Sequence, residues 1–525
     1  MKNSLNLSQK PRQELQLMIT HLQKQYDELA QQFSIKECRL IAERDSFKQK
    51  YNQLVEQLKL ARLKRFGQSS EKSEQLALFD EADTPLPPET KATVELPEKS
   101  DQRKKAKAKK RNRRIQLPDN LPVEEIIHDV PEEDKTCGCG HSRHRIGEEV
   151  SDQLKYIPAK LVIERHIRPK YGCRACEAGI KIAPMPLLLL PKSIATPELV
   201  AQTILAKYED HIPLYRQEKQ WKRLGIDLPR NSCCAWVMKV AEFCEPLYGL
   251  LKEDMLKSTY VQADETPVLV LKSKEAKKRK KAYMWCYRSH PPNGLSAIYF
   301  EYQSTRSGKH AQAFLKDFEG YLQSDMYNGY NFLAKKETVI HLGCMAHARR
   351  RFADIVKTHQ TPGLAVHAMK FFKALYKIER RIKNDSIEKR YTVRQDRSTH
   401  VLKQFKKWLE KSIQQVPDGF AIGIAIQYCL THWEPLTNYT KDGMLHIDNN
   451  FIENTIRPFA LGRKNWMFKG SPRGAKAGAI FYSLLATCKA NQINPQDYLV
   501  KMLSNIRRCK TIEDFRALLP YNIQL

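Results

Sequence analysis

The chain has 525 residues and a formal net charge of +30, from 89 Lys and Arg against 59 Asp and Glu. This length allows several domains of roughly 100–200 residues each. Such an excess of positive charge repels itself unless a polyanion neutralises it, which favours nucleic acid as a partner over a merely basic soluble protein.

The location of the protein is constrained by what the sequence lacks. The N-terminal sequence has no apolar stretch of the roughly 7–15 residues that a signal peptide needs. The longest apolar runs, PMPLLLLP and FAIGIAIQYCL, are shorter than the ~20 residues that cross a bilayer. The 13 cysteines therefore favour reduced thiols or metal ligands over disulfides. We expect a cytoplasmic protein without a membrane partner.

Residues 11–64 show the periodicity of a coiled coil. Apolar side chains recur every seven residues at Ile19, Tyr26, Phe33, Leu40, Phe47, Leu54 and Ala61. Heptads sustained over this length predict a leucine-zipper-like helix through which chains associate. The alternative is a long helix packed on its own domain.

A linker over residues 65–114 separates this helix from the next region. It is acidic and proline-containing at first and then contains DQRKKAKAKKRNRR, in which nine of fourteen residues are Lys or Arg. Such a run is typical of a solvated tail, and it can also neutralise phosphates without reading sequence.

Residues 115–183 contain two close cysteine pairs. The four thiols, which together can close a tetrahedral zinc site, are Cys137, Cys139, Cys173 and Cys176. The second pair has the usual CxxC spacing, whereas the first is CxC, and 33 residues separate the pairs. His141, His144 and His166 are alternative ligands. The pattern predicts a small zinc-finger-like module that binds Zn²⁺.

Residues 184–256 are predicted to be helical. The segment GIDLPRNSCCAWVMKVAEFC has a glycine turn, after which Pro229 and Ser232 open an amphipathic helix. This is the outline of a helix-turn-helix, whose second helix can enter a major groove. Plain helical packing explains the pattern equally well.

Segments with the sequence pattern of β-strands begin after residue 257. TYVQADETPVLVL, KKAYMWCYR and LSAIYFEYQ are three strand candidates, and the basic insert KSKEAKKRKK connects the first two. A helix in GKHAQAFLKDFEG, a strand ending at Asp325 and a further strand in TVIHL follow. This order predicts an α/β fold with a ribonuclease H-like catalytic core over 257–480. We expect a helical insertion at about 355–440 and a C-terminal helical segment over 481–525.

A ribonuclease H-like core places acids on its first strand, at the end of its fourth strand and on a late helix. Asp264, Asp325 and Glu453 occupy those positions. Carboxylates suit Mg²⁺ or Mn²⁺, and two such ions assist phosphoryl transfer by neutralising the attacking and leaving oxygens. We therefore predict these three residues to be both catalytic and metal-binding.

The sequence around Glu453, LHIDNNFIENTIRPFALGRKNWMF, is unusually polar. Residues 448–450 are predicted to form the turn and cap of the helix that carries Glu453. The predicted DNA-binding residues are Arg457, Arg463, Lys464 and Trp466, the last of which either stacks on a displaced base or packs in the core.

Two further pairs, Cys344-x-x-His347 and Cys429-x-x-His432, have spacing that suits metal ligands. A second metal site built from both pairs is one interpretation. Ordinary structural roles are the preferred one.

Several long sequence motifs resemble those of the insertion sequence 66 family of bacterial transposases. They include ADETP, SDMYNGY, CMAHARRRF and IDNNFIENTIRPFALGRKNW, and they are preceded by RFGQSSEK and KYEDHIPLYRQE and followed by GSPRGAKAGAIFYSLLATCKANQINPQDYL. The resemblance implies that Asp264, Asp325 and Glu453 are the catalytic carboxylates of a DDE transposase. It also implies a zinc-finger-like cysteine module.

The leading functional hypothesis is a cut-and-paste or replicative DNA transposase. Its expected partners are double-stranded DNA of the element ends and target, further copies of itself, and accessory proteins of the same element, in the nucleoid of a bacterial cytoplasm. A nuclease or resolvase that uses the same core only for hydrolysis is an alternative. A non-catalytic DNA-binding regulator is another, although such a protein has no need of the three acids.

Overall fold

The computed structural model describes residues 12–66, 161–172, 180–271, 280–290, 295–358, 363–417 and 419–524. The chain divides into two units, one formed by Met1–Glu89 and Arg168–Leu525 and the other by Thr90–Ile167. Of the second unit only residues 161–167 are described, and they form an exposed stretch without regular structure. The four predicted zinc cysteines and most of the linker lie outside the described residues.

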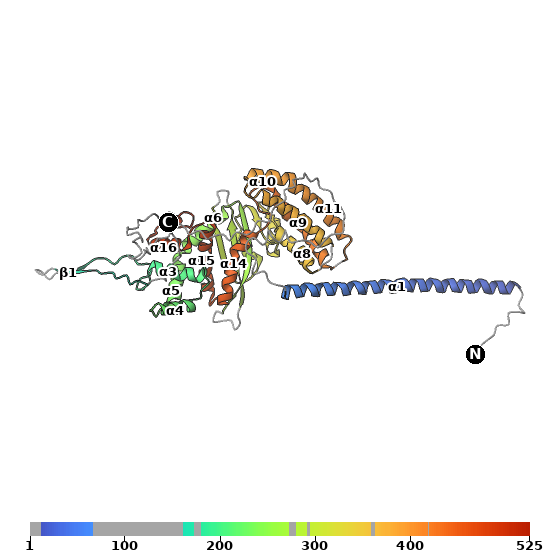
Figure 1. Cartoon of the computed structure of the whole chain (residues 1–525), viewed down its shortest axis with the longest axis horizontal. Coiled ribbons are helices and arrows are strands. Elements are labelled where there is room, and N and C mark those ends of the chain that lie inside the picture. The colour runs from blue at the N-terminus through green and yellow to red at the C-terminus, as the bar shows by residue number, and fades with distance from the viewer. Residues whose placement is uncertain are drawn as a thin grey trace, which may run out of the picture. The chain divides into compact units, whose positions relative to one another are not determined.

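A five-stranded mixed sheet forms the centre of the larger unit (Figure 1). Its strands are β3 (Tyr260–Val270), β4 (Lys280–Ser289), β5 (Ile298–Gln303), β6 (Gly320–Gln323) and β7 (Val339–Leu342). They lie in the order β5-β4-β3-β6-β7. The β3–β4 and β4–β5 pairs are antiparallel, whereas β3–β6 and β6–β7 are parallel. The strands therefore occur where the sequence predicts them, except that β6 ends at Gln323, two residues before its predicted end at Asp325.

The parallel half of the sheet is reached through a short connection. It runs from β5 through α7 (Gly308–Phe314) to β6 and then through the 3-10 helix η4 (Asn328–Lys335) to β7. Most residues of β3 are buried, as expected for a central strand that is covered on both faces.

The edge strand β5 is covered by a helix that comes much later in the chain, α15 (Pro472–Ala490). The Ser483 hydroxyl accepts the Phe300 N–H at 2.8 Å, and the Thr487 hydroxyl accepts the Ile298 N–H at 3.1 Å. Just beyond α15, the Asn491 side chain bonds both the N–H and the carbonyl of Ser296. Side chains of the C-terminal region thus satisfy the N–H groups of Ser296, Ile298 and Phe300 along this edge.

Helices that come before and after the five strands in the sequence share the hydrophobic core of the sheet. They are α3 (Pro197–Tyr208), α4 (Leu214–Arg223), α5 (Arg230–Phe243), α6 (Glu245–Leu256), α14 (Asn450–Trp466), α15, α16 (Pro495–Asn505), the short 3-10 helix η7 (Ile506–Arg508) and α17 (Ile512–Ala517). Buried side chains from α3, α5 and α16 join those from the strands in one cluster. Residues 184–256 and 481–524 are therefore built into the same core as the sheet.

The predicted helix-turn-helix corresponds to α4 and α5. Gly225 takes a positive φ of 89° in the turn between them, a conformation that glycine adopts without strain. Helix α5 begins directly after Pro229, and its apolar side chains Trp236, Val237 and Val240 are buried. Packing accounts for the apolar face of α5, and its role in a DNA groove stays a prediction.

A bundle of helices lies between β7 and α14, with its own hydrophobic cluster. It comprises α8 (Met345–Thr358), α9 (Leu364–Arg381), α10 (Ile387–Val393), the π-helical turn η5 (Arg394–Ser398), α11 (Thr399–Ile413), α12 (Ala421–Thr431), α13 (Trp433–Thr437) and the 3-10 helix η6 (Asn438–Lys441). Aromatic rings at its centre, including Phe352, Phe372 and Phe405, contact one another at centroid distances of 5.2–5.6 Å. This bundle corresponds to the predicted helical insertion.

One fully buried arginine joins the bundle to the segment that leads into α14. Arg394 makes two bonds to the Glu379 carboxylate, at 2.9 and 2.7 Å. Its other bonds go to the carbonyls of Tyr439, Asp442, Gly443 and Leu445, at 2.8–3.4 Å. A Cβ at Gly443 would lie 1.8 Å from the Ile387 carbonyl oxygen, so only glycine permits this close approach. The bundle therefore fixes the backbone just before Asp448.

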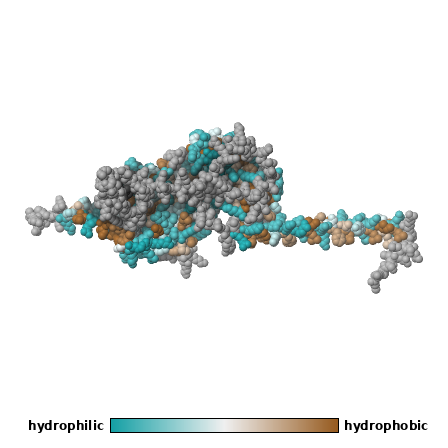
Figure 2. Space-filling model, in the orientation of Figure 1, coloured by the Kyte–Doolittle hydropathy of each residue, from teal (hydrophilic) through white to brown (hydrophobic). Residues whose placement is uncertain are grey.

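The N-terminal helix α1 (Arg12–Phe66) carries large apolar side chains in an exposed position. They include Ile19, Leu22, Tyr26, Leu29, Phe33, Leu40, Phe47, Leu54 and Leu58. Figure 2 shows brown, hydrophobic patches along this helix. Near its C-terminal end, the buried Glu56 accepts the Ala421 N–H at the start of α12, at 3.1 Å.

Two short strands, β1 (Lys170–Gly172) and β2 (Ile180–Ile182), pair antiparallel. They bracket in sequence the second predicted cysteine pair. None of the described helices has both the length and the apolar composition to span a membrane.

Candidate active site

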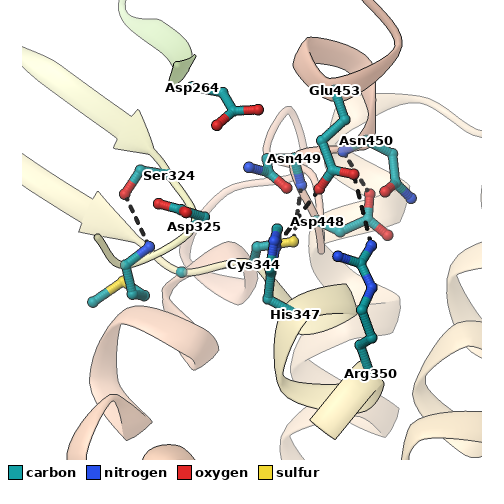
Figure 3. A network of polar contacts seen from close by, with 12 residues as sticks. Asp264, Ser324, Asp325, Cys344, His347, Arg350, Asp448, Asn449, Asn450 and Glu453 are labelled. Atoms are coloured by element: carbon teal, nitrogen blue, oxygen red, sulfur yellow. Dashed lines mark hydrogen bonds and ion pairs between the residues drawn. The ribbon is translucent and has the colours of Figure 1, made fainter. Parts of the chain in front are cut away.

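The three predicted acids come together where the sheet meets the start of α14 (Figure 3). Asp264 lies on β3, Asp325 follows β6 by two residues, and Glu453 lies in the first turn of α14. Because β3 and β6 are adjacent parallel strands, the acids that follow Gln262 and Gln323 by two residues lie at neighbouring positions. The geometry thus unites residues that are up to 189 positions apart in sequence (453 − 264).

A buried network of two glutamines holds these three segments in place. The Gln262 side-chain amide donates to Gln323 Oε1 at 2.7 Å and to the Asp448 carbonyl at 3.1 Å. The Gln323 amide donates in turn to the His446 carbonyl at 2.9 Å, and the Tyr260 hydroxyl donates to Gln323 Oε1 at 2.5 Å. Sequence reasoning missed this network. The matching positions of Gln262 and Gln323, each two residues before an acid, were the available signal.

The turn before α14 is built from Asp448 and two asparagines. Asp448 accepts the Asn450 N–H at 3.3 Å and the Tyr376 hydroxyl at 2.9 Å, so its carboxylate helps to start the helix. Burial raises the pKa of Asp448 to about 6. Asn449 occupies the N-cap position but its side chain makes no capping bond. The predicted turn and cap are therefore present, with the carboxylate of Asp448 as the capping group.

The carboxylates of the site repel one another. Burial raises the pKa of Asp264 well above its usual value, and the negative charges of Glu265, Asp325 and Glu453 raise it further. Burial also raises the pKa of Glu453, an effect that the nearby Arg350 guanidinium partly offsets. Such a cluster is stabilised by a bound cation or by protons.

Glu265, the residue after Asp264, has a different role. Its fully buried carboxylate pairs with Arg306 at 2.7 Å and accepts the Tyr330 hydroxyl at 3.4 Å. The Arg306 guanidinium also stacks over the Tyr327 ring at 3.8 Å. Glu265 is thus neutralised inside the protein, which leaves Asp264 as the acid of β3 that is available to a ligand.

Two side chains of α8 lie beside Glu453. His347 Nδ1 is 3.6 Å from Glu453 Oε1, and Arg350 Nη2 is 3.8 Å from Oε2. Burial lowers the pKa of His347 to about 4, so that the imidazole is neutral near pH 7. Cys344, one residue before α8, is fully buried, and its sulfur accepts the Asn449 N–H at 3.4 Å. Cys429 and His432, the other CxxH pair, are not part of this group.

The predicted DNA-binding residues of α14 have different surroundings. Arg457 is exposed one turn after Glu453, and Lys464 is exposed near the end of the helix. Arg463 donates to the Pro267 carbonyl and to the Thr266 hydroxyl of β3, so it holds α14 against the sheet. Trp466 is partly buried, and its ring lies against Gly462 and edge-on to His211. Arg463 and Trp466 thus contact other elements of the fold, and their role in DNA binding stays a prediction.

Comparison with known proteins defines the relationship of the chain. The model of the Transposase IS66 family matches residues 192–477, which include all three acids. The chain belongs to this family. Two further family models match other parts of the chain. The model of the zinc-finger binding domain of transposase IS66 matches residues 134–177, and the model of the IS66 C-terminal element matches residues 483–521. A model described as transposase C of IS166 homeodomain matches residues 53–126.

Chains similar to this one occur in Sinorhizobium fredii (strain NBRC 101917 / NGR234). Uncharacterized protein y4jD is 33% identical over 469 residues, which cover 86% of this chain and 91% of the relative. Uncharacterized protein y4hP is 32% identical over 420 residues, covering 76% and 75% respectively.

All four predicted zinc cysteines fall inside the matched zinc-finger domain. The family supports a transposase-type enzyme that uses a divalent metal and contains a zinc-finger region.

Proposed function

We propose that this transposase binds the ends of its insertion element and catalyses metal-dependent cleavage and transfer of DNA strands. Asp264, Asp325 and Glu453 are the proposed catalytic carboxylates. The observation that carries the proposal is their convergence from two adjacent parallel strands and the first turn of one helix. An arrangement of this kind is suited to holding divalent ions beside a phosphodiester.

The strand order supports a ribonuclease H-like core for this enzyme. Three antiparallel strands come first in the chain, and the first of them pairs with a fourth strand that runs parallel to it. In such a core the acids are expected on the first strand, after the fourth strand and on a later helix. Asp264, Asp325 and Glu453 have these places in the chain.

The residues present fit a hard divalent cation such as Mg²⁺ or Mn²⁺. Their ligand atoms are carboxylate oxygens, which these ions prefer, and Glu453 Oε1 is buried without a hydrogen-bond partner among the described residues. Burial and, after it, the repulsion of neighbouring carboxylates raise the pKa of Asp264, and a bound cation would offset this repulsion. Bound ions would supply that charge to the attacking and leaving oxygens during phosphoryl transfer.

The remaining groups of the site act on the DNA and on the acids. Asp264, Asp325 and Glu453 would hold the ions, while the glutamine network keeps their segments in register. Arg350 is half-exposed beside Glu453, and Arg457 and Lys464 are exposed on α14, so these three cations are the proposed phosphate contacts. Phosphate contacts position DNA without reading its sequence.

Other regions would supply recognition and assembly. We propose that the zinc-finger region, with Cys137, Cys139, Cys173 and Cys176 as Zn²⁺ ligands, and the basic linker contribute to binding of element ends and target. Helix α1 would join copies of the chain, because synapsis of two ends needs more than one. We propose that the protein acts in the nucleoid of the cytoplasm and that accessory proteins of the element are further partners.

The decisive experiment uses Glu453→Gln in the full-length protein. Glutamine keeps the size of the side chain and the packing of α14, but it lacks the negative charge that a metal ion requires. We expect a gel shift with element-end DNA to be unchanged and to keep its steep salt dependence, whereas cleavage and strand transfer in Mg²⁺ or Mn²⁺ are lost. Asp264→Asn and Asp325→Asn should behave alike, and the losses should not add.

The matched control is Glu337→Gln, which removes an exposed carboxylate before β7 and should keep full activity. Thermal melting checks the folding of each variant. Wild-type cleavage by a well-folded Glu453→Gln protein would show that the proposed catalytic role of α14 is wrong. Cleavage products without joined strands in the parent protein would instead favour the nuclease.

A further inference from the structure

One group of potential metal ligands differs chemically from the three acids. The sulfur of Cys344, a ring nitrogen of His347 and a carboxylate oxygen of Glu453 all lie within 4.8 Å of one another. We propose that these three residues form a binding site for a borderline-soft divalent cation such as Zn²⁺, which overlaps the Mg²⁺ site at Glu453 and inhibits the enzyme. The inhibitory effect rests on the proposed function, whereas binding of the ion does not.

The spacing of the ligand atoms fits such an ion. Zinc bonds of about 2.0–2.3 Å in a tetrahedral site place neighbouring ligand atoms about 3.3–3.8 Å apart. His347 Nδ1 and Glu453 Oε1 are separated by 3.6 Å. Both atoms are buried, and neither has a hydrogen-bond partner among the described residues. Two ligands are therefore already at the required separation without competing bonds.

The backbone that carries these ligands is firmly placed. Cys344 lies directly before α8 and His347 lies in its first turn, and their spacing of three residues brings the two side chains to the same side. The Met345 N–H donates to the Ile447 carbonyl at 3.1 Å, which ties this helix start to the segment before α14. Binding would then need only side-chain movement, to bring the sulfur closer.

Burial raises the pKa of the Cys344 thiol well above its usual value, and a contact with the Asn449 backbone opposes this effect. The Asn449 N–H points at Cys344 Sγ from 3.4 Å, which compensates negative charge on a thiolate. Asn449 is fully buried, and both polar atoms of its side chain lack partners within the described part of the chain. Figure 3 shows its amide beside Cys344 and Glu453, where it can serve the ion or a water bound to it.

The ligand types determine which ion is selected. Mg²⁺ prefers oxygen ligands, whereas a set of one sulfur, one nitrogen and one oxygen suits Zn²⁺ or Co²⁺. On binding, the Cys344 thiol loses its proton to solvent, neutral His347 uses the lone pair of Nδ1, and Glu453 binds as the carboxylate. The chain contributes three ligands, so one position remains for water. Glu453 is then no longer available to the ions of the acid cluster.

The test measures Co²⁺ binding to the full-length, chelator-treated protein by its thiolate-to-metal absorbance. We compare the parent with Cys344→Ala, His347→Gln and the matched control Cys429→Ala, which removes the buried cysteine of the other CxxH pair. We expect Cys344→Ala and His347→Gln each to bind one equivalent fewer than the parent, and Cys429→Ala to bind the same number. Since the zinc-finger region is present in all four proteins, only the difference reports the new site.

Inhibition is measured as the ratio of Mg²⁺-dependent end cleavage with and without an added equivalent of Zn²⁺, within each protein. Added Zn²⁺ should lower cleavage at least tenfold in the parent and in Cys429→Ala, and a chelator should restore it. In Cys344→Ala, added Zn²⁺ should change cleavage little. Equal Co²⁺ stoichiometry in the parent and in a folded Cys344→Ala or His347→Gln protein overturns the proposal. If none of the proteins cleaves DNA but Cys344→Ala and His347→Gln still bind one Co²⁺ equivalent fewer than the parent, the metal site is supported and the proposed function fails.

Discussion

Arg394→Met tests whether the helical bundle supports the active site through one buried ion pair. The Arg394 side chain is fully buried and that of Glu379 is only 10% exposed. Methionine keeps much of the volume but leaves the Glu379 carboxylate buried without its partner. Three carbonyls, those of Tyr439, Asp442 and Gly443, also lose a donor, whereas Leu445 keeps its bond from Arg390.

The size of the effect follows from these contacts. Removing one partner of a buried ion pair costs about 3–5 kcal/mol. For a folded unit of a few hundred residues, each kcal/mol lowers the melting temperature by about 2–4 °C, so we expect a decrease of about 6–20 °C. The double variant Arg394→Met with Glu379→Met should recover part of this loss, because no unpaired charge remains.

Differential scanning calorimetry of the full-length protein provides the measurement. The control is Lys389→Met in the same bundle, where Lys389 pairs with Asp385 at 3.1 Å but is 64% exposed, and where we expect almost no change. Equal melting temperatures for the parent and Arg394→Met would refute the reasoning that this pair holds the bundle to the segment before α14.

Three further predictions concern other parts of the chain. Deletion of residues 1–64 should give a smaller assembly in analytical sedimentation, because the exposed apolar heptads of α1 are removed; an unchanged mass contradicts a coiled coil. Replacement of Cys173 and Cys176 by Ser in the full-length protein should remove one tightly bound zinc by metal analysis, and retention of that zinc would exclude them as ligands. In metal-free buffer Asp264→Asn should raise the melting temperature at pH 8, since the folded protein binds the Asp264 proton more tightly than the unfolded chain does, and ionisation therefore opposes folding. This advantage should grow as the pH rises from about 4 through the raised pKa, and a pH-independent difference would contradict the assigned cause.

The sequence predicted the strands and the three acids because these signals are local. Alternation of apolar and polar residues defines β3, β4 and β5, and turn residues define the end of β6. Asp264 and Asp325 could be placed because each lies on or directly after such a strand. The expected order of strands and acids in a ribonuclease H-like core selected the three acids, and the family resemblance, which the family comparison confirms, implied their catalytic role.

The contacts between distant segments could not be predicted in the same way. The CxxH spacing offered a joint metal site with Cys429 and His432 only as the less favoured interpretation for Cys344 and His347. In the structure the third member of their group is Glu453, more than 100 positions away from His347. Arg463 is predicted to contact phosphate, and its bond to the Pro267 carbonyl of β3 is a further contact that its charge does not indicate. Partners of this kind depend on how the bundle docks, which no local pattern encodes.

The covering of β5 by α15 has a consequence for the chain during synthesis. Strand β5 emerges from the ribosome long before Ser483 and Thr487, so the N–H groups of Ile298 and Phe300 remain an open sheet edge until the last part of the chain follows. Open edges pair with strands of other molecules. A polypeptide that ends between Trp466 and Pro472 would contain all three acids and still aggregate through this edge. Intact chains being translated beside it would expose the same edge for a time and would be drawn into the same aggregates.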